Sequence, residues 1–445
     1  MLRGVSMKEI NKEWLKLVKN EYENNKNLST LRRALAKNDI NSSTYNVDVE
    51  GKDAFRFSID INTMPATNQK QSGRCWIFAG LNFLREIIGK KHNIENFEFS
   101  QNYVAFYDKL EKINFILEKS IELRHKDEDD RVLTWLLSTG IADGGQWDMF
   151  VNVVEKYGLV SKDAMPETAA SSGTRQMNYL INSMLRKFNA DIRKEKTEEK
   201  IREIKDKTMG EAYNLLCTCF GKPPAKFDFE YVDKNKEYHM IKDILPLEFY
   251  QNYVGDVLKD YVSIINAPTS DKPFNKTYTV DYLGNVIDGK DILYLNLEMN
   301  EFKELVLKQL KDKEIVWFGS DCSNYGDRPK GYWDDKLFSY NESFEIDFNL
   351  TKEESLLYRH SAMNHAMVLT GVNLDEGNPT KWKIENSWGS DVANKGYYMC
   401  SDTWFDRFVY QAVVNKKYLS AEQKKLLKSK PTHLNPWDPM GTLAD

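Results

Sequence analysis

A cysteine, a histidine and an asparagine in this chain each lie in a local sequence that suits covalent attack on a carbonyl group. Cys75 follows the loop Gln69–Arg74 and opens the run CWIFAGLNFLREIIGK, which predicts a buried helix over residues 75–90. The unpaired N–H groups and the positive dipole end of a helix N-terminus favour a thiolate over a thiol. Because a thiolate is the form that attacks carbonyl carbon, Cys75 is the candidate nucleophile.

Gln69 precedes Cys75 by six positions and carries a side-chain amide. Its NH₂ group and the backbone N–H of Cys75 would make a pair of donors for the oxyanion that forms on the attacked carbonyl. Taken alone, a cysteine at the start of a helix is more commonly a small core residue. The catalytic interpretation of Cys75 therefore needs a base elsewhere in the chain.

His365 is the candidate base, and Asn386 is the residue that would orient it. His365 opens the apolar run AMVLTGV, which predicts a buried strand, and Asn386 follows 21 positions later. A strand, a loop and a return strand would bring the two side chains together, so that the amide oxygen accepts the Nδ1–H and the other ring nitrogen faces sulfur. Trp388 would shield this hydrogen bond from water. The alternative is a hydrogen-bonded core histidine, which is common in apolar strands.

The elements that must position these residues fall into two unlike halves. In the first part of the chain apolar residues recur at helical spacing, which predicts helices within residues 7–37, 75–90, 99–123 and 149–157. Later segments are short and rich in β-branched and aromatic residues, which predicts strands at residues 278–286, 292–297, 315–319, 366–372, 382–384, 397–400 and 408–414. Helices followed by strands favour an α+β fold over a doubly wound sheet.

Charge and proline content divide the chain into four approximate parts. Residues 1–159 form an N-terminal segment and a helical half, and the highly charged residues 160–275 are predicted to be a mainly helical insertion. Residues 276–430 are the strand-rich half. The last 15 residues hold three of the chain's 12 prolines. Because proline fixes φ and blocks helix, residues 431–445 are predicted to be an extended arm.

Composition excludes several classes of protein. The 445 residues carry 62 Lys and Arg against 67 Asp and Glu, a net charge of −5, which gives no electrostatic footprint for nucleic acid. Five cysteines make no disulfide framework and indicate a reducing compartment, the cytoplasm by default. No apolar run approaches the roughly 18 residues of a membrane span, and the first residues show no secretory signal.

The Gln69 to Trp76 segment, His365 with its strand, and Asn-Ser-Trp-Gly at 386–389 together resemble the papain superfamily. In papain and cathepsins the histidine follows the cysteine by about 130–150 residues, whereas here the separation is 290 (365 − 75). An insertion of that size resembles the bleomycin hydrolase and aminopeptidase C branch. The blocks QSGRCWIFAGLN, PETAASSGTRQMN, EIVWFGSDC, HAMVLTGV, IENSWG and DPMGTLA extend the resemblance over nearly the whole chain.

The resemblance implies a papain-like fold with Cys75 on a helical half and His365 and Asn386 on a β-barrel half. It makes Trp76 and Trp388 supporting residues of the site. Ser72 and Ala142 stand where secreted relatives have a disulfide pair, which fits an intracellular protein.

The resemblance also implies where a peptide would bind. Gly144 and Gly145 would offer their unshielded backbone to an extended substrate, although paired glycines are more often a simple turn. Ala444 and Asp445 would end an arm that lies in the enzyme's own cleft and blocks the groove beyond the first substrate residue. The terminal carboxylate would then pair with the free α-amine of a peptide.

The implied function is that of a cytoplasmic cysteine aminopeptidase that needs no metal or organic cofactor and assembles as a homohexamer. Hydrolysis of the amide of bleomycin-like compounds is a further implied activity. Two alternatives stay open at this point: an endopeptidase on the same site, and a nucleic-acid-binding or peptide-binding protein with incidental peptidase activity. His360 and His365 lack the spacing of a zinc motif, so no metal site is expected.

Overall fold

The computed structural model of the chain describes residues 8–50 and 54–444. The chain divides into two units, one made of Met1–Ala54 with Asp334–Leu350 and one made of Phe55–Trp333 with Thr351–Asp445. The first unit consists of helices α1 (Lys12–Asn24), α2 (Lys26–Leu35), α3 (Ile40–Thr44), α4 (Val47–Glu50) and α14 (Tyr340–Phe344). The surface helices predicted within residues 7–37 are α1 and α2, and neither has a buried residue. All candidate site residues belong to the second unit.

The helical half of the second unit begins with the helix that carries Cys75. This helix, α5 (Cys75–Lys91), is buried along most of its length, as its nearly continuous apolar sequence predicts. It packs against α6 (Gln101–Glu122) and α8 (Trp147–Tyr157), the two helices predicted at residues 99–123 and 149–157. A shorter helix, α7 (Arg131–Thr139), connects them.

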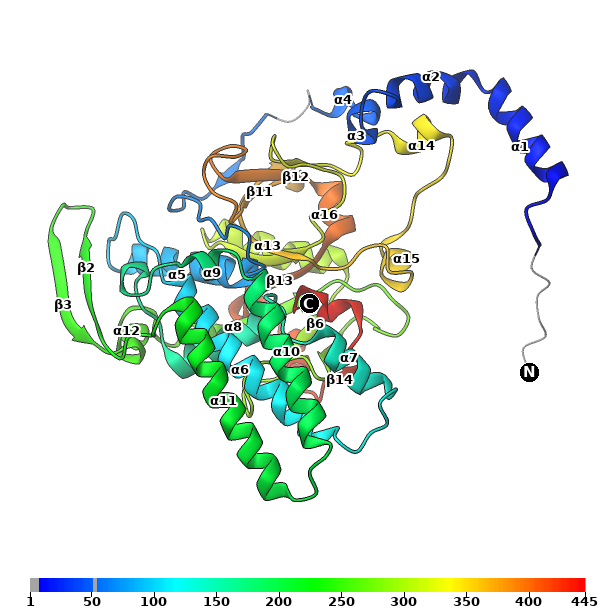
Figure 1. The fold of residues 1–445 in the computed structure, drawn as a ribbon. Coiled ribbons are helices and arrows are strands. Elements are labelled where there is room, and N and C mark those ends of the chain that lie inside the picture. Colours follow the sequence, from blue (N-terminus) through cyan, green and yellow to red (C-terminus); the bar gives the residue numbers. More distant parts are fainter. Residues whose placement is uncertain (1–7, 51–53, 445) are drawn as a thin grey trace. The chain divides into compact units, whose positions relative to one another are not determined.

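The segment 160–275 contains helices α9 (Ala169–Ser172), α10 (Arg175–Ile192), α11 (Glu198–Phe220) and α12 (Pro246–Tyr253), with the 3₁₀ turns η1 (Lys162–Ala164) and η2 (Gly255–Asp260). The long helices α10 and α11 lie alongside α6 (Figure 1). The segment also holds a hairpin of β2 (Phe227–Val232) and β3 (Tyr238–Ile244), and its last part, predicted as insertion, contains β4 (Tyr261–Ile265), a strand of the main sheet. The sequence prediction missed this hairpin because charged residues alternate with the buried Phe227 and Phe229, a two-residue period hidden in a charged segment.

The strand-rich half is built on one sheet whose order is β14-β5-β6-β4-β13-β7-β10-β11-β12-β9-β8, with β1 paired to β10. Every strand predicted after residue 276 overlaps a strand of this sheet. The strands are β1 (Ile59–Asp60), β4 (Tyr261–Ile265), β5 (Lys276–Val280), β6 (Tyr294–Asn296), β7 (Val316–Ser320), β8 (Gly326–Asp327), β9 (Tyr332–Trp333), β10 (His365–Asp375), β11 (Asn378–Glu385), β12 (Tyr397–Ser401), β13 (Val409–Asn415) and β14 (Thr432–Leu434). The helices of this half are α13 (Met299–Lys311), α15 (Lys352–Leu357), α16 (Asp402–Phe408) and α17 (Ala421–Leu426), with η3 (Lys416–Tyr418).

Strand β10 connects the two halves. It runs antiparallel between β7 and β11, with His365 opposite Ser320 and Val368 opposite Glu385. Helix α5 packs against both β10 and β7. The fully apolar start of β10 is buried on both faces, as a central strand covered by a helix requires. This packing brings the N-terminus of α5 to the first residue of β10.

The C-terminal segment is only in part the extended arm that its prolines predicted, because strand β14 (Thr432–Leu434) is extended and the end of the segment is not. After β14 it ends in the 3₁₀ helix η4 (Pro439–Ala444), and Met440 and Leu443 are buried. Proline is tolerated at the start of a helix because the N–H that it lacks would be unpaired there anyway. Met440 and Leu443 are three residues apart and therefore share one face of a 3₁₀ turn, so their burial favours the helical form.

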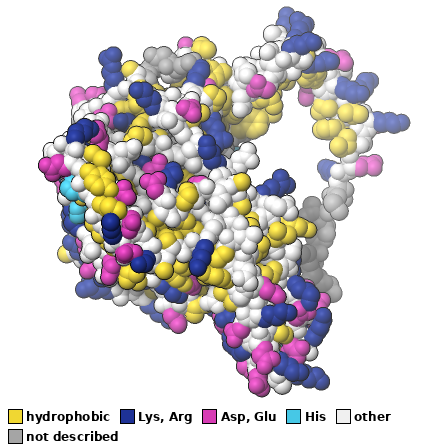
Figure 2. Space-filling model, turned by 60° about the vertical axis from the view of Figure 1, so that its left-hand side comes forward, with side chains coloured by type: hydrophobic (Ala, Val, Ile, Leu, Met, Phe, Trp, Pro, Cys, Tyr) yellow, Lys and Arg dark blue, Asp and Glu magenta, His cyan; other side chains and the backbone are white. Residues whose placement is uncertain are grey.

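Positive and negative side chains are interspersed over the face of the molecule drawn in Figure 2. This mixture agrees with the small net charge of −5. Among the described residues no helix is both long enough and apolar enough to cross a bilayer.

Candidate active site

Cys75 is the first residue of α5 and its side chain is buried against β10. The Sγ atom accepts a hydrogen bond from the backbone N–H of Ala366 at 3.4 Å. Ala366 directly follows His365, so the candidate nucleophile contacts the residue next to the candidate base although Cys75 and His365 are 290 positions apart. The preceding residue, Arg74, caps the helix through its backbone carbonyl, which accepts the N–H groups of Ile77 and Phe78 at 3.0 and 3.1 Å.

His365 and Asn386 form the predicted pair, but through the other ring nitrogen. The contact joins Nε2 of His365 to Oδ1 of Asn386 at 2.8 Å, not Nδ1 as the sequence analysis expected. Oδ1 also accepts the backbone N–H of Ser387 at 2.7 Å, which identifies it as the acceptor oxygen. The neutral imidazole therefore carries its proton on Nε2 and leaves Nδ1 as the acceptor. Asn386 directly follows the return strand β11, and Nδ1, the ring nitrogen nearer the backbone, does not take part in this contact.

Trp388 lies flat against the imidazole. The rings of His365 and Trp388 are stacked, with centroids 4.9 Å apart and planes inclined by 25°. Asn386 is fully buried and His365 is 5% exposed. The shielding role predicted for Trp388 is consistent with this geometry, because an apolar cover strengthens the hydrogen bond beneath it.

Gln69 is fixed at both ends of its amide. Nε2 donates to the carbonyl of Ser72 at 2.6 Å, and Oε1 accepts the hydroxyl of Ser387 at 2.6 Å. The Nε2 group has two hydrogens, and the Ser72 contact uses one of them. The second is left for an oxyanion. Ser387, which holds both Gln69 and Asn386, was not singled out from the sequence, because a serine after the asparagine gives no signal of its own.

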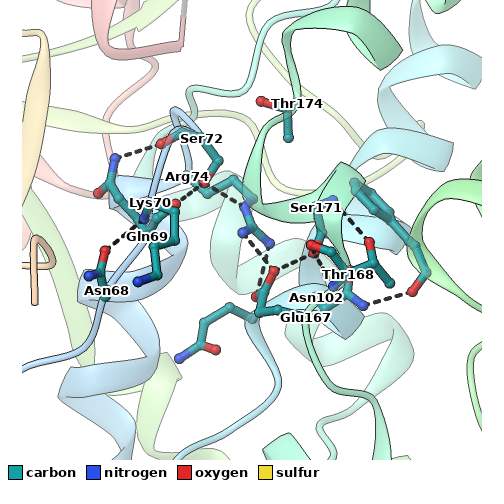
Figure 3. A network of polar contacts seen from close by, with 12 residues as sticks. Asn68, Gln69, Lys70, Ser72, Arg74, Asn102, Glu167, Thr168, Ser171 and Thr174 are labelled. Atoms are coloured by element: carbon teal, nitrogen blue, oxygen red, sulfur yellow. Dashed lines mark hydrogen bonds and ion pairs between the residues drawn. The ribbon is translucent and has the colours of Figure 1, made fainter.

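A buried polar network supports the loop that precedes Cys75 (Figure 3). Arg74 is 1% exposed and forms a two-pronged ion pair with Glu167 at 2.9 and 3.2 Å. Its Nε donates to the hydroxyl of Ser72 at 2.9 Å, and that hydroxyl donates to the carbonyl of Gln69 at 2.6 Å. Bidentate pairs of this kind fix geometry as well as adding energy. Ser72 is thus part of the support for Gln69.

Asp143 joins the nucleophile loop to the glycine segment. Its carboxylate forms an ion pair with the buried Lys109 at 2.7 Å and accepts the backbone N–H of Gly73 at 3.3 Å. Its carbonyl accepts the indole N–H of Trp76 at 2.7 Å. Lys112 donates to the carbonyl of Gly144 at 2.5 Å. These contacts hold Gly144 and Gly145 beside the start of α5. Because Lys109 and Lys112 belong to α6, this helix helps to position the glycines, which its sequence alone did not indicate.

The two glycines face the C-terminal segment of the chain itself. The N–H of Gly145 donates to the carbonyl of Leu443 at 3.0 Å. A Cβ atom on Gly144 would come within 2.2 Å of the same carbonyl, so only glycine permits this approach. On the other side, the hydroxyl of Thr442 donates to the carbonyl of Met363 at 2.8 Å. The carbonyl of Leu443 therefore binds the backbone N–H of Gly145, which was predicted to bind substrate.

The arm is anchored before it reaches the glycines. Lys272 and Asp438 form an ion pair at 2.9 Å in which both side chains are at least 90% buried. Strand β14 pairs in parallel with β5. Ala444 is half-buried at the end of η4, and Asp445, the predicted partner of a substrate amine, lies outside the described residues.

Burial disfavours the charged forms of both Cys75 and His365. Desolvation raises the pKa of the Cys75 thiol to about 11, although the backbone N–H groups of Ala366, Trp76 and Cys75 act in the opposite direction. Desolvation also lowers the pKa of His365 to about 4. The N–H groups at the helix start act in the predicted direction, but burial outweighs them. At neutral pH a thiolate therefore needs a base beside it that takes up the thiol proton.

Arg328 places a permanent charge next to this pair. Its guanidinium carbon lies 3.5 Å from the centroid of the Trp388 ring, whose plane is also stacked with His365. The charge of Arg328 acts to lower the pKa of His365. Arg328 could not be predicted as a site residue, because an exposed arginine in a loop belongs to no motif or periodic pattern in the sequence.

Replacing Arg328 with glutamine is expected to move the acid limb of the kcat/KM profile, which reports the protonation of His365, upward by about half a pH unit, as expected for a charge about 8 Å away in a largely aqueous medium. The sign follows because removing a nearby cation makes the imidazolium harder to deprotonate. Arg328→Lys keeps the charge and should show a smaller shift. Superimposable profiles for the wild type and Arg328→Gln would contradict the assignment.

Among the residues that the structure describes, one group of three side chains has metal-ligand spacing, namely Asp233, Glu237 and His239 at the β2–β3 hairpin. None of the three is a member of the site around Cys75. The chemistry available at that site is a thiol, an imidazole, an orienting amide and a set of N–H donors.

Comparisons with known proteins extend over nearly the whole chain. The Peptidase C1-like family matches residues 9–441. The Aminopeptidase C of Listeria innocua is 45% identical over 437 residues, which cover 98% of this chain and 99% of the relative. The mouse protein Bleomycin hydrolase is 40% identical and the match covers 88% and 89% of the two chains. The crystal structure of PepW from Lactobacillus rhamnosis superimposes with a TM-score of 0.95 at 46% identity, covering 97% of this chain and 99% of PepW.

Proposed function

The chain belongs to the Peptidase C1-like family and is a cysteine aminopeptidase, and we propose that its chemistry is carried by Cys75, His365, Asn386 and Gln69. The papain-like α+β fold expected from the sequence is confirmed by the likeness to PepW. The observation that carries the proposal is the meeting of the start of α5 with the start of β10, where Ala366 contacts Cys75 and His365 contacts Asn386.

The first half of the proposed reaction is acylation. Nδ1 of His365 takes the proton of the Cys75 thiol as sulfur forms a bond to the carbonyl carbon of the substrate. The resulting oxyanion accepts hydrogen bonds from the second Nε2 hydrogen of Gln69 and the N–H of Cys75. The carbon–nitrogen bond then breaks, and the imidazolium gives its proton to the leaving amine. Asn386 holds the ring through both stages.

The second half is deacylation. A water molecule attacks the thioester while His365 accepts its proton at Nδ1. The carbon–sulfur bond then breaks to release the acid, and the imidazolium returns the proton to sulfur, which restores the thiol and the neutral imidazole. The ion pair exists while each step proceeds, which agrees with burial holding both groups neutral at rest. No step in this sequence draws on a metal or an organic cofactor.

The C-terminal arm supports removal of single residues from the N-terminus. Leu443 occupies the N–H of Gly145, so an extended peptide lacks that backbone partner on the arm side of the nucleophile. Only one substrate residue would then fit between the arm and the scissile bond. The alternative of an endopeptidase needs the arm to leave a position that Lys272, Thr442 and β14 anchor. The charges of the face in Figure 2 are mixed, so it offers no basic surface to support the nucleic-acid alternative.

Peptides with a free N-terminus are the proposed substrates, with bleomycin-like amides as a further class because a relative is named Bleomycin hydrolase. A cytoplasmic location fits the five cysteines, none of which is in a disulfide. A homohexamer is proposed from the family resemblance.

A panel of aminoacyl-amide substrates tests the proposed function. The wild-type enzyme is expected to release the amine from free aminoacyl amides and to leave N-acetylated counterparts at less than about a hundredth of that rate. Treatment with iodoacetamide should abolish the activity in proportion to alkylation of one thiol, identified as Cys75 by peptide mass mapping. Equal rates on free and acetylated amides, or activity that persists after alkylation of Cys75, would refute it.

A further inference from the structure

A pocket of about 760 Å³ lies on the C-terminal half of α5, away from the catalytic end of that helix. Glu86, which lines it, is eleven residues after Cys75, or about 16 Å along the axis at 1.5 Å per residue. The walls are mainly apolar and include Ile61, Phe83, Ile87, Ile94, Val257 and Ile315. Volume and lining are those of a small-molecule site.

Glu86 is an incompletely satisfied carboxylate in this pocket. Its Oε1 accepts the backbone N–H of Met64 at 2.8 Å, and the structure assigns Oε2 no hydrogen bond among the described residues. Arg85 approaches Oε1 at 3.5 Å, but its guanidinium is hydrogen-bonded to Glu385 at 2.8 Å. The mechanism proposed above makes no use of Glu86. The Glu86 side chain is 21% exposed, so Oε2 is open to an incoming hydrogen-bond donor.

The mouth of the pocket is positively charged. Lys90, Lys234 and Lys313 line it, and among the described residues none of the three has an assigned carboxylate partner. The two acidic residues at the same rim are already paired, Glu95 with Lys236 at 2.6 Å and Glu314 with Lys417 at 2.5 Å. The pocket thus presents a carboxylate oxygen to which no hydrogen bond is assigned among the described residues, apolar walls, and exposed lysines that form no ion pair within that part of the chain.

This arrangement is complementary to a small zwitterion. We propose that the pocket binds a free α-amino acid with an apolar side chain, its ammonium group on Glu86, its carboxylate at the rim lysines and its side chain against the apolar walls. A simple amine would leave the lysines unused, and a fatty acid would leave Glu86 unpaired. A free amino acid is also the product that an aminopeptidase releases, and this part of the inference rests on the proposed function.

Hydrogen bonds connect the wall of the pocket to the residue that precedes Asn386 in the catalytic site. The carbonyl of Met64 accepts from Arg85 at 2.9 Å, and the hydroxyl of Thr63 donates to Glu385 at 2.6 Å. Glu385 directly precedes Asn386, which orients the imidazole. A ligand on Glu86 therefore contacts a network that ends one residue from the catalytic amide.

Binding to Glu86 has a proton signature. Burial raises the pKa of Glu86 to about 7, with Arg85 and Lys234 acting to lower it and Glu385 acting to raise it. The carboxyl is then roughly half protonated at pH 7, whereas an ammonium group bound to it favours the ionised form. Binding at pH 7 should therefore release up to about half a proton per site.

Isothermal titration calorimetry of L-leucine into the full-length Cys75→Ser protein tests the proposal. We expect a dissociation constant of about 0.1–1 mM, as suits a ligand of nine non-hydrogen atoms. The measured heat should depend on the ionisation enthalpy of the buffer, reporting proton release. L-Leucinamide and N-acetyl-L-leucine, which each lack one charge, should bind at least about 10-fold more weakly.

Two variants locate the site. Glu86→Gln should weaken leucine binding at least about 10-fold and abolish the proton release, whereas Glu95→Gln, at the paired rim acid, should change neither. Lys90→Gln, an exposed change that does not threaten folding, should weaken leucine binding but not that of L-leucinamide. Leucine affinity that is unchanged in Glu86→Gln would overturn the proposal. Because binding is measured on a protein without the nucleophile, that result would leave the proposed peptidase function intact.

Discussion

Replacing Cys75 with serine is expected to lower kcat/KM for aminoacyl amides by at least about 10⁴-fold. A serine hydroxyl is a much weaker nucleophile than the thiolate formed beside His365, and loss of a covalent nucleophile typically removes most of the catalysis above the oxyanion and binding contributions. The serine oxygen can still accept the N–H of Ala366, so the fold should be retained. Steady-state kinetics with purified variants, checked by thermal denaturation, measure the effect.

His365 supplies the complementary control. His365→Ala should lose a similar factor, and the double variant Cys75→Ser with His365→Ala should lose little more, because the two groups act as one unit. Cys219→Ser, at a half-buried thiol on α11, should keep full activity. Additive losses in the double variant would mean that Cys75 and His365 work independently, contrary to the proposed mechanism.

The same pair predicts the reactivity of the thiol. Without the imidazole, Cys75 keeps a pKa that burial raises to about 11, so only about one thiol in 10⁴ is ionised at pH 7. Iodoacetamide should therefore modify Cys75 in His365→Ala at least about a hundredfold more slowly than in the wild type at neutral pH. The rate should then rise as pH is increased toward 11.

Truncation after Gly441, which removes Thr442–Asp445, is expected to convert the enzyme from an exopeptidase to one that also cuts within blocked peptides. The deletion removes the carbonyl of Leu443 from the N–H of Gly145 and frees that donor for a substrate backbone. Hydrolysis of N-acetylated peptides of four to six residues should rise by at least about 100-fold over the full-length enzyme. Mass spectrometry of the products identifies the bond that is cut.

Thr442→Val is the matched control, because it removes the hydrogen bond to Met363 but leaves the arm at full length. This variant should retain strict N-terminal release. Truncation also uncovers the site of the buried Leu443, so the folded fraction must be checked by calorimetry. A truncated protein that is folded, active on free aminoacyl amides and still inert toward acetylated peptides would show that the arm does not determine exopeptidase action.

The order of elements could be predicted because their signals are local. Apolar residues at helical spacing indicated α5 and α8, and short β-branched runs indicated strands β5, β6, β7 and β10 to β13. The β2–β3 hairpin was missed because its alternating pattern lies in a charged segment. The end of the arm was predicted to be extended and is a 3₁₀ helix, because burial of Met440 and Leu443 outweighs the local effect of proline.

The sequence by itself determined which side chains are available for the chemistry: a thiol at a helix start, an imidazole at a strand start and an amide 21 residues later. Tertiary structure decided which atoms meet. Nε2 of His365 contacts Asn386, and the hydroxyl of Ser387 donates to Gln69. The guanidinium of Arg328 stacks on Trp388, and the carbonyl of Leu443 accepts the N–H of Gly145. Periodicity and residue type are properties of neighbours along the chain, whereas ring orientation, desolvation and charge proximity arise between segments hundreds of residues apart.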